Sequence, residues 1–517
     1  MQQLSGQDAM FIHTELDGLP QHIGGLSIYD QSTVPGGNLR FKDILKLIEK
    51  RAHLSGVFTR KLQRVPYNLD QPYWVESDDF DVERHVHHIA LPKPGDWRQL
   101  CILASRLHSR PLDMSLPLWE MYVIGGLDNI RDLPKGCFAV MIKVHHAAMD
   151  GATAAKFIPA LHDLSPEVAS HDAPGPRVIK KINNVELLGR AYVNNMRKPR
   201  QAVRLAGQLV PAVQRIREGL KRGDFKSLSD KQKTRFQGKI SPHRVCDAVP
   251  FDFEEVRAIK NSVEGATIND TMLCIVGGGM LRYLTANKEK PEQSLVTGCP
   301  IDVRSDSERA AGGNMVGFMN VSLCTDIKHP LKRLAAIHTA STGSKAYAQA
   351  LGPRIAMDVT DVLPGGMLSV ALRAASMTGL TEAGTIFNTV VTNVPGPPIQ
   401  LYFAGAALVD GMNFGPLLPN VGLFQIVSSS VQNKRGTITL SFTACRDMMP
   451  DPELYADCLR ESFEELKAAA LASAKKTLKK PAKKPAAKKA APKAAKQKAA
   501  KKKVARKAAA KKPAAAA

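Results

Sequence analysis

The chain has 517 residues, 44% of them hydrophobic and 23% charged, and is therefore long enough for two or more domains of ordinary size. No stretch is long and apolar enough to predict a transmembrane helix, and the first residues lack the pattern of a secretory signal. The eight cysteines form no CxxC pair and lie mostly in apolar runs. We therefore expect a reduced, cytoplasmic protein without disulfides and without a bound metal.

The formal net charge of +23 is typical of a nucleic-acid-binding protein, but it is unevenly distributed. From residue 475 to the end there are 18 Lys or Arg and no acidic residue, which leaves 53 basic against 48 acidic residues before that point. The basic character therefore belongs to the C-terminal tail and not to the body of the protein.

Residues 1–165 form a predicted mixed α/β segment. Its elements in chain order are a strand at 26–29, a helix at 41–54, a strand at 73–76 and a helix at 97–107. Residues 137–144 follow as an almost continuous apolar run, in which Lys143 is the one charged residue. Such a run is typical of a strand that is buried on both faces.

Residues 166–240 differ from the segment before them. After a proline-containing polar loop, 190–221 carries many basic residues among regularly spaced apolar ones. This pattern predicts a basic amphipathic helix, which fits either a solvated linker between domains or an element that lies on a membrane surface.

Residues 241–467 form a second predicted α/β segment. Its helices are predicted at 256–263, 269–284 and 453–467, and its strands at 294–299, 321–325, 385–393 and 437–445. From residue 468 the chain is almost only Ala, Lys and Pro, cannot bury a core, and is expected to be disordered.

The run His145-His146-Ala147-Ala148-Met149-Asp150-Gly151 directly follows the predicted buried strand. Polar residues at a strand end are a common place for an active site in α/β folds. Gly151 would allow a tight turn, and Asp150 would cap the helix predicted at 152–164. A structural role or a weak metal site is the alternative for a histidine pair considered alone.

The complete pattern resembles the signature of the CoA-dependent acyltransferase superfamily, which includes chloramphenicol acetyltransferase, carnitine acyltransferases and peptide-synthetase condensation domains. Further matches are similar to the bacterial wax ester synthase/diacylglycerol acyltransferase family. They are Leu4–Phe11, His22–Leu26, Pro117–Glu120, Thr267–Asp270, Pro300–Arg304, Gly313–Gly317 and Asn393–Pro397. The resemblance implies two chloramphenicol-acetyltransferase-like domains, 1–165 and 241–467, joined by the helical linker 166–240 and followed by the tail 468–517.

The resemblance also implies roles for the residues of the signature. His146 would be the general base that takes the hydroxyl proton, and His145 would support it or share its role. Asp150 would be structural, and Arg304 is our candidate for the partner that a buried aspartate requires. Gly151 would provide the turn.

Four further residues are substrate-site candidates on the same ground. Asn269 and Asp270 would lie near the site, with Asn269 the better candidate for orienting a polar group. Asn393 could shape the acyl or CoA channel through a rigid turn. Trp119 either contributes to the site or packs into the domain core.

The resemblance implies transfer of a long-chain acyl group from acyl-CoA to diacylglycerol or a fatty alcohol, with no cofactor beyond the acyl-CoA co-substrate. A membrane surface or lipid inclusion is the expected location, and the tail could bind either nucleic acid or anionic lipid. Two alternatives stay open: a superfamily acyltransferase that uses carrier-bound substrates, and a protein that binds polyanions or inclusions through its tail.

Overall fold

The structure is a computed structural model that describes residues 1–16, 18–130, 132–149, 151–171, 182–222, 232–302, 316–351, 387–396, 398–432 and 435–479. The chain divides into two units, 1–474 and 475–517, and the first contains every sheet described below. Disorder was predicted for the tail, 468–517. Of these residues, 480–517 lie outside the described ranges.

The first large sheet has six described strands in the order β12-β13-β2-β7-β6-β5. Their bounds are β2 His22–Asp30, β5 Val86–Ala90, β6 Trp119–Gly125, β7 Phe138–His145, β12 Tyr402–Phe403 and β13 Ala406–Phe414. Strands β2 and β7 are antiparallel and place His22 opposite His145. The pairing requires glycine at position 24, because a Cβ there would lie 2.7 Å from the backbone oxygen of Ile142.

The second large sheet also has six described strands, in the order β10-β9-β11-β14-β15-β8. Their bounds are β8 Arg244–Asp252, β9 Val296–Asp302, β10 Val316–Ser322, β11 Thr389–Pro395, β14 Leu423–Gln432 and β15 Arg435–Cys445. A small sheet, in the order β1-β4-β3, is formed by β1 Gln2–Gln3, β3 Arg60–Gln63 and β4 Tyr73–Glu76.

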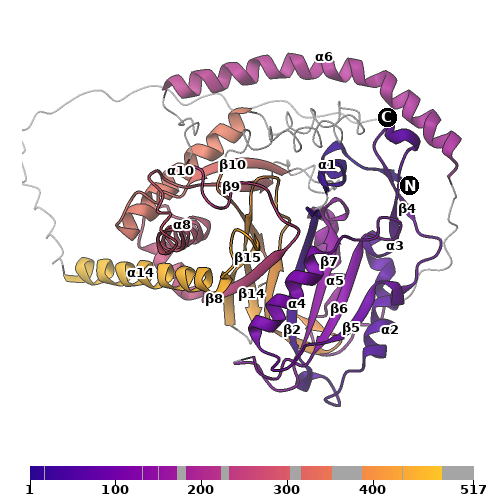
Figure 1. The fold of residues 1–517 in the computed structure, drawn as a ribbon, viewed down its shortest axis with the longest axis horizontal. Coiled ribbons are helices and arrows are strands. Elements are labelled where there is room, and N and C mark those ends of the chain that lie inside the picture. Colours follow the sequence, from indigo (N-terminus) through magenta and orange to yellow (C-terminus); the bar gives the residue numbers. More distant parts are fainter. Residues whose placement is uncertain are drawn as a thin grey trace, which may run out of the picture. The chain divides into compact units, whose positions relative to one another are not determined.

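The described α-helices are α1 Gly6–Thr14, α2 Phe41–Arg51, α3 Gly56–Thr59, α4 Trp97–Ser109, α5 Gly151–Leu161, α6 Asn184–Arg222, α7 Phe253–Asn261, α8 Ile268–Ala286, α10 Pro330–Leu351 and α14 Pro452–Lys479. Short 3-10 turns are η1 Gln31–Thr33, η2 Ala52–Leu54, η3 Pro66–Asn68, η4 Val82–Arg84 and η5 His146–Ala148. Residues of α2 and α5 share a core with the first sheet, and residues of α8 and α14 share one with the second. Figure 1 shows the long helix α6 at the outside of the fold.

Most predicted elements are confirmed, including the buried strand before the histidines, which is β7. The strand expected at 321–325 is instead β10, which ends at Ser322. The reason is local, because Cys324 has a φ of 47° and cannot continue an extended strand.

Two features of the topology cross the predicted segment boundaries. Strands β12 and β13 come from the segment 241–467 but extend the first sheet, because β13 pairs with β2. The last helix continues past 467 to Lys479, since Ala and Lys favour helix and Leu466 and Ala470 pack into the core.

Candidate active site

The histidine pair lies where β7 ends and the short turn η5 begins, before α5 starts at Gly151. Backbone hydrogen bonds hold both histidines. The amide of His145 donates to the Leu118 carbonyl at 3.0 Å, and the amide of His146 donates to the Gln21 carbonyl at 2.8 Å. The order of strand, histidine pair, turn and helix is therefore as predicted, and the neighbouring segments fix its backbone.

Both ring nitrogens of His145 are engaged. Its Nδ1 accepts a hydrogen bond from the Ala147 amide at 3.1 Å, so the proton is on Nε2, which lies 3.1 Å from a carboxylate oxygen of Glu15. The side chain is fully buried. His145 is therefore held as a donor to Glu15 and has no free lone pair for a substrate proton.

The ring of His146 has a different environment. It stacks on Phe11 of α1, with ring centroids 3.9 Å apart and planes at 12°, and it is partly exposed. Burial is the main cause that lowers the pKa of His146 to about 4; a hydrogen bond to its own backbone opposes the shift, and the neighbouring His145 ring adds to it. The surroundings therefore keep this ring neutral well into the acid range.

Glu15 is the residue of this site that the sequence did not reveal. It follows the last residue of α1, and its second carboxylate oxygen lies 3.7 Å from Nε2 of His22. Burial, followed by the charge of Lys143, lowers the pKa of His22 well below its ordinary value. No local pattern marks Glu15, because its partner His145 is 130 residues away in the chain.

The contacts of Lys143 explain why the apolar strand β7 contains one charged residue. Its ammonium group is buried, pairs with Glu120 at 2.8 Å, and donates to the carbonyls of Leu107 and Arg110 near the end of α4. The strand that carries the histidines is thereby tied to α4 beneath the site.

Asp270 has a capping role at the start of α8. It exchanges hydrogen bonds with Thr267, and its carboxylate accepts from Ser341 at 2.7 Å and lies 3.0 Å from Nδ1 of His338. Burial raises the pKa of Asp270, but the hydrogen bonds outweigh this and leave it lowered. Asn269, partly buried in the same first turn, stays a substrate-site candidate.

Trp119 is completely buried and packs in the core. Its indole N–H donates to the Phe58 carbonyl at 3.1 Å, and its ring stacks on His85 at 4.6 Å. These contacts favour the packing role over direct contact with a substrate. Asn393 is exposed on β11, where its backbone faces Val427 of β14.

Asp150 and Arg304 lie outside the described residues, so their pairing stays a prediction. A different buried ion pair supports the segment that follows the motif. One terminal nitrogen of Arg51 donates to both carboxylate oxygens of Asp163 at 2.8 Å, just beyond the end of α5.

Among the described residues, no group of three or more His, Cys, Asp or Glu side chains could hold a metal ion. The helices that the structure describes include none with the length and apolarity needed to span a membrane. All eight cysteines are unpaired thiols, and all but Cys324 are buried.

The two six-stranded sheets, with a histidine pair at the end of a central strand, resemble the fold of condensation domains. The starter condensation domain of rhizomide synthetase, solved with C8-CoA and Leu-SNAC, aligns with a TM-score of 0.52 over 90% of this chain and 94% of its own, at 12% identity.

The chain belongs to the wax ester synthase/diacylglycerol acyltransferase family. The family's catalytic domain matches residues 4–272, and its C-terminal domain matches 312–467. A Mycobacterium tuberculosis protein named "Putative diacyglycerol O-acyltransferase" is 31% identical over 471 residues, which cover 90% of each chain. The wax ester synthase/diacylglycerol acyltransferase from Marinobacter aquaeolei VT8 aligns with a TM-score of 0.64 at 24% identity, over 91% of this chain and all of its own.

Proposed function

We propose that this acyltransferase moves a long-chain fatty acyl group from acyl-CoA to the hydroxyl of diacylglycerol or of a long-chain alcohol. The products would be triacylglycerol or a wax ester. The observation that carries the proposal is the unequal histidine pair: His145 is held by Glu15, while His146 is neutral, partly exposed and stacked on Phe11. The names of the relatives support these substrates.

The reaction follows from the proton-accepting state of His146. Its ring takes the proton of the acceptor hydroxyl as the oxygen attacks the thioester carbonyl, which gives a tetrahedral intermediate. The intermediate collapses to the ester, the C–S bond breaks, and its electron pair leaves with sulfur. An imidazolium with a pKa of about 4 readily returns the proton to a thiolate, because a thiol has a pKa of about 8.5.

Direct transfer fits the state of the cysteines better than an acyl-enzyme intermediate. Burial raises the pKa of Cys137 to about 11 and that of Cys274 and Cys299 to about 12. Such thiols stay protonated at neutral pH and are poor nucleophiles.

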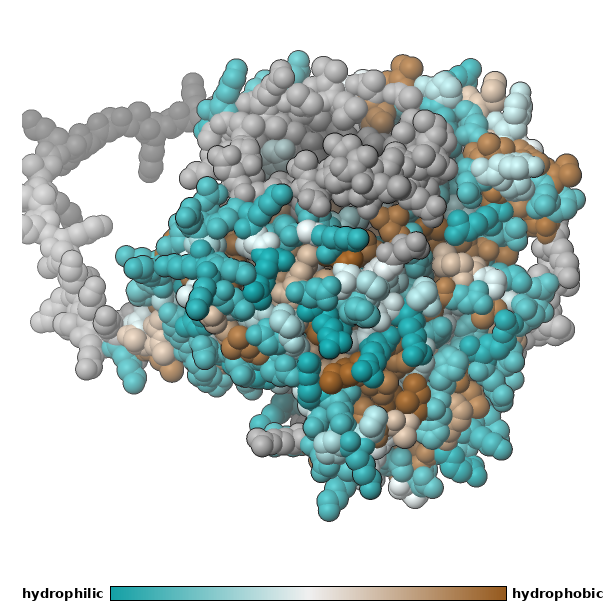
Figure 2. Space-filling model, viewed as in Figure 1, coloured by the Kyte–Doolittle hydropathy of each residue, from teal (hydrophilic) through white to brown (hydrophobic). Residues whose placement is uncertain are grey.

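The helix α6 supports the further proposal that the enzyme meets its lipid acceptor at a membrane or inclusion surface. Its inward side is packed, since Leu187, Ala191 and Leu205 are buried and Asn194 and Lys198 both contact Asp70. The opposite side presents four apolar residues that are 64–77% exposed, which we call the outer face of α6: Val185, Tyr192, Met196 and Val203. Figure 2 shows apolar surface at the upper right, where the first half of α6 lies.

The outer face of α6 fits an anionic lipid surface because of its spacing and the charge beside it. Spacings of seven, four and seven residues align its four members along one side of the helix. Arg197, Arg200 and Arg204 are exposed nearby, and within the described ranges they form no ion pair. Each basic residue near such a surface contributes about 1 kcal/mol to binding.

The function is tested with purified protein, palmitoyl-CoA and either dipalmitoylglycerol or hexadecanol. We expect free CoA and an ester in equal amounts. If CoA forms only by hydrolysis, or if acyl transfer requires a carrier-bound donor, the proposed donor and acceptor are wrong.

The lipid-surface proposal is tested by cosedimentation with phosphatidylglycerol vesicles at about 0.3 M salt, which screens contributions from the basic tail. Tyr192→Asp and Met196→Asp should each lower the bound fraction. Leu471→Asp, at an exposed apolar position of α14, is the matched control and should bind normally. Equal binding by all three variants would exclude the outer face of α6 as the contact.

A further inference from the structure

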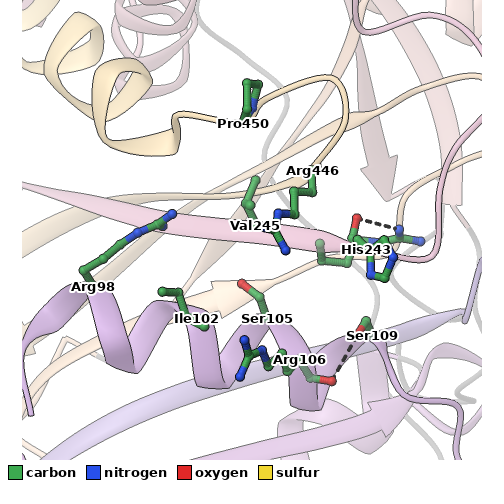
Figure 3. Close-up of a pocket in the computed structure, with 10 residues that line it drawn as sticks. Arg98, Ile102, Ser105, Arg106, Ser109, His243, Val245, Arg446 and Pro450 are labelled. Carbon is green, nitrogen blue, oxygen red and sulfur yellow. Dashed lines mark hydrogen bonds between the residues drawn. The ribbon is translucent and has the colours of Figure 1, made fainter. Parts of the chain in front are cut away.

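A cavity of about 180 Å³ lies between α4, the start of β8 and the turn that follows β15. Its basic lining residues come from these three segments and are Arg98, Arg106, His243, Arg244 and Arg446. We call the space that they surround the arginine cavity. Figure 3 shows Arg98 and Arg106 on one side of the space and His243 and Arg446 on the other. None of the described residues that line it is acidic.

Most of this positive charge is not compensated. Arg98 pairs with Glu453, but Arg106 and Arg446 are exposed and make no ion pair with any residue that the structure describes. Arg244 is buried, and its guanidinium donates to the carbonyls of Gly18 and Ser241. Burial lowers the pKa of Arg244 to about 10, which reflects the cost of keeping this charge.

An anion in the cavity would offset this cost. Guanidinium groups bind oxyanions through pairs of N–H donors, and they match phosphate as well as carboxylate. The cations of the arginine cavity approach from three separate segments. A phosphate group, which offers several oxygens in different directions, satisfies such an arrangement better than the two coplanar oxygens of a carboxylate.

The arginine cavity is also linked to the histidine pair through α4. His108, in the last turn of this helix, has its ring 6.3 Å from that of His22, which in turn lies 5.9 Å from the ring of His145. Arg106 and Ser109, both lining residues, flank His108 in sequence. Helix α4 therefore contributes both to the lining of the cavity and, through His108, to the group of buried rings that reaches His145.

We propose that the arginine cavity binds the phosphate groups at the nucleotide end of acyl-CoA. This inference rests on the proposed function, because CoA carries its phosphates at one end and its thioester at the other. A donor whose thioester is beside His146 must place its phosphates at a distance from it. The cavity supplies a cationic site of that kind.

The direct test is calorimetric titration with adenosine 3′,5′-bisphosphate, which has phosphates but no acyl group. Arg106→Gln combined with Arg446→Gln should weaken binding at least tenfold. The control Arg257→Gln, an exposed arginine of α7 paired with Glu254, should bind as the unchanged protein does. If the double variant binds the bisphosphate as tightly as the unchanged protein does, the proposal is overturned. The single substitution Arg446→Lys, which keeps the charge but loses the paired donors, should give a smaller loss if the double variant is unstable.

Inorganic phosphate and vesicles containing phosphatidic acid distinguish other sources of the same chemistry. If the double variant loses only its binding to these vesicles, the site belongs to a lipid headgroup and the CoA assignment is wrong. If inorganic phosphate binds as tightly as the bisphosphate, the nucleotide is not recognised and the assignment is again wrong.

A kinetic comparison separates this inference from the proposed function. In the double variant, the KM for palmitoyl-CoA should rise about tenfold, whereas the KM for S-palmitoyl-pantetheine, which lacks the nucleotide, should not change. Acyl transfer with an unchanged KM for palmitoyl-CoA would refute the cavity assignment alone. Normal binding of the bisphosphate by a protein that transfers no acyl group would refute only the proposed function.

Discussion

The two adjacent histidines differ because each has different neighbours. His145 has its two ring nitrogens bound to the Ala147 amide and to Glu15, which fixes its orientation. His146 has an aromatic ring against one face, and burial keeps it neutral. We expect the backbone of η5 to transmit the rigidity of the first residue to the second, so that Glu15 would position the proposed base through His145.

Glu15→Ala should therefore lower kcat by roughly 100-fold, because a small displacement of a reacting group can cost this much. Glu15→Gln keeps an oxygen that accepts from Nε2 of His145, so it should retain most of the activity. The measurement is kcat and KM for both variants with palmitoyl-CoA. A fully active alanine variant would remove Glu15 from the account.

The pH dependence of kcat/KM should report the lowered pKa of His146. The neutral ring accepts the proton, and the protonated ring cannot, so activity is lost as the pH falls through about 4. The profile should be flat between about pH 6 and 8. A midpoint near 6.5, the ordinary value for histidine, would show that the base is less buried than described here.

The sequence could predict the histidine pair but not its supporting groups. His145 to Gly151 is a continuous pattern that directly follows an apolar strand. Glu15 and Phe11 reach the pair only through folding; Glu15 lies outside every matched block, and the block Leu4–Phe11 did not reveal that Phe11 stacks on His146. Trp119 shows the opposite case. Its block, Pro117–Glu120, was recognisable in the sequence, but the side chain is fully buried in the core.

At the scale of elements, the helix α5 after the motif is held by the ion pair between Arg51 and Asp163. Asp163 also accepts from the Ala169 amide, and Arg51 also donates to the Ala169 carbonyl. This buried cluster connects the end of α2 to the segment after α5.

Asp163→Asn should destabilise the protein by about 3–5 kcal/mol, because it leaves the buried Arg51 charge without a counter-charge. The measurement is the urea midpoint of unfolding. Asp43→Asn, in an exposed pair with Arg40, is the control and should leave the midpoint nearly unchanged. If both variants unfold at the same midpoint, the buried pair does not support α5.

Elements with a clear apolar period were predictable, and those without one were not. Strand β8 contains Pro250 and two aspartates, which disfavour a strand, yet it forms the edge of the second sheet. A proline is tolerated at an edge, where its missing N–H costs no ladder hydrogen bond. Helix α10 was missed because its apolar residues do not gather on one side.

At the scale of the whole chain, the presence of two sheet-based domains was predictable from the resemblance. The contribution of β12 and β13 from the second segment to the first sheet was not. The sheet that bears the histidines is extended by β13, which pairs with β2 although the paired residues lie 377 to 390 positions apart in the chain. Such pairing depends on tertiary contacts that no local sequence period reports.

The basic tail should determine how the whole chain binds polyanions. Residues 480–517 contain 15 Lys or Arg and no acidic residue. A chain that ends at Lys479 should lose most of its affinity for DNA and anionic vesicles at low salt, because the counterion-release contribution is removed. It should keep acyl transfer to acceptor dispersed in detergent. Fluorescence anisotropy and vesicle binding measure the first, and CoA release the second; unchanged affinity would exclude a binding role for the tail.

The proposed mechanism requires His146 to take the proton of the acceptor hydroxyl. The most direct test is the initial rate of ester formation from palmitoyl-CoA and dipalmitoylglycerol or hexadecanol by His146→Ala, alongside the unchanged protein and with folding verified by circular dichroism. Loss of a general base should lower the rate by about 100- to 10,000-fold. A folded His146→Ala protein that forms ester at the original rate would contradict the account.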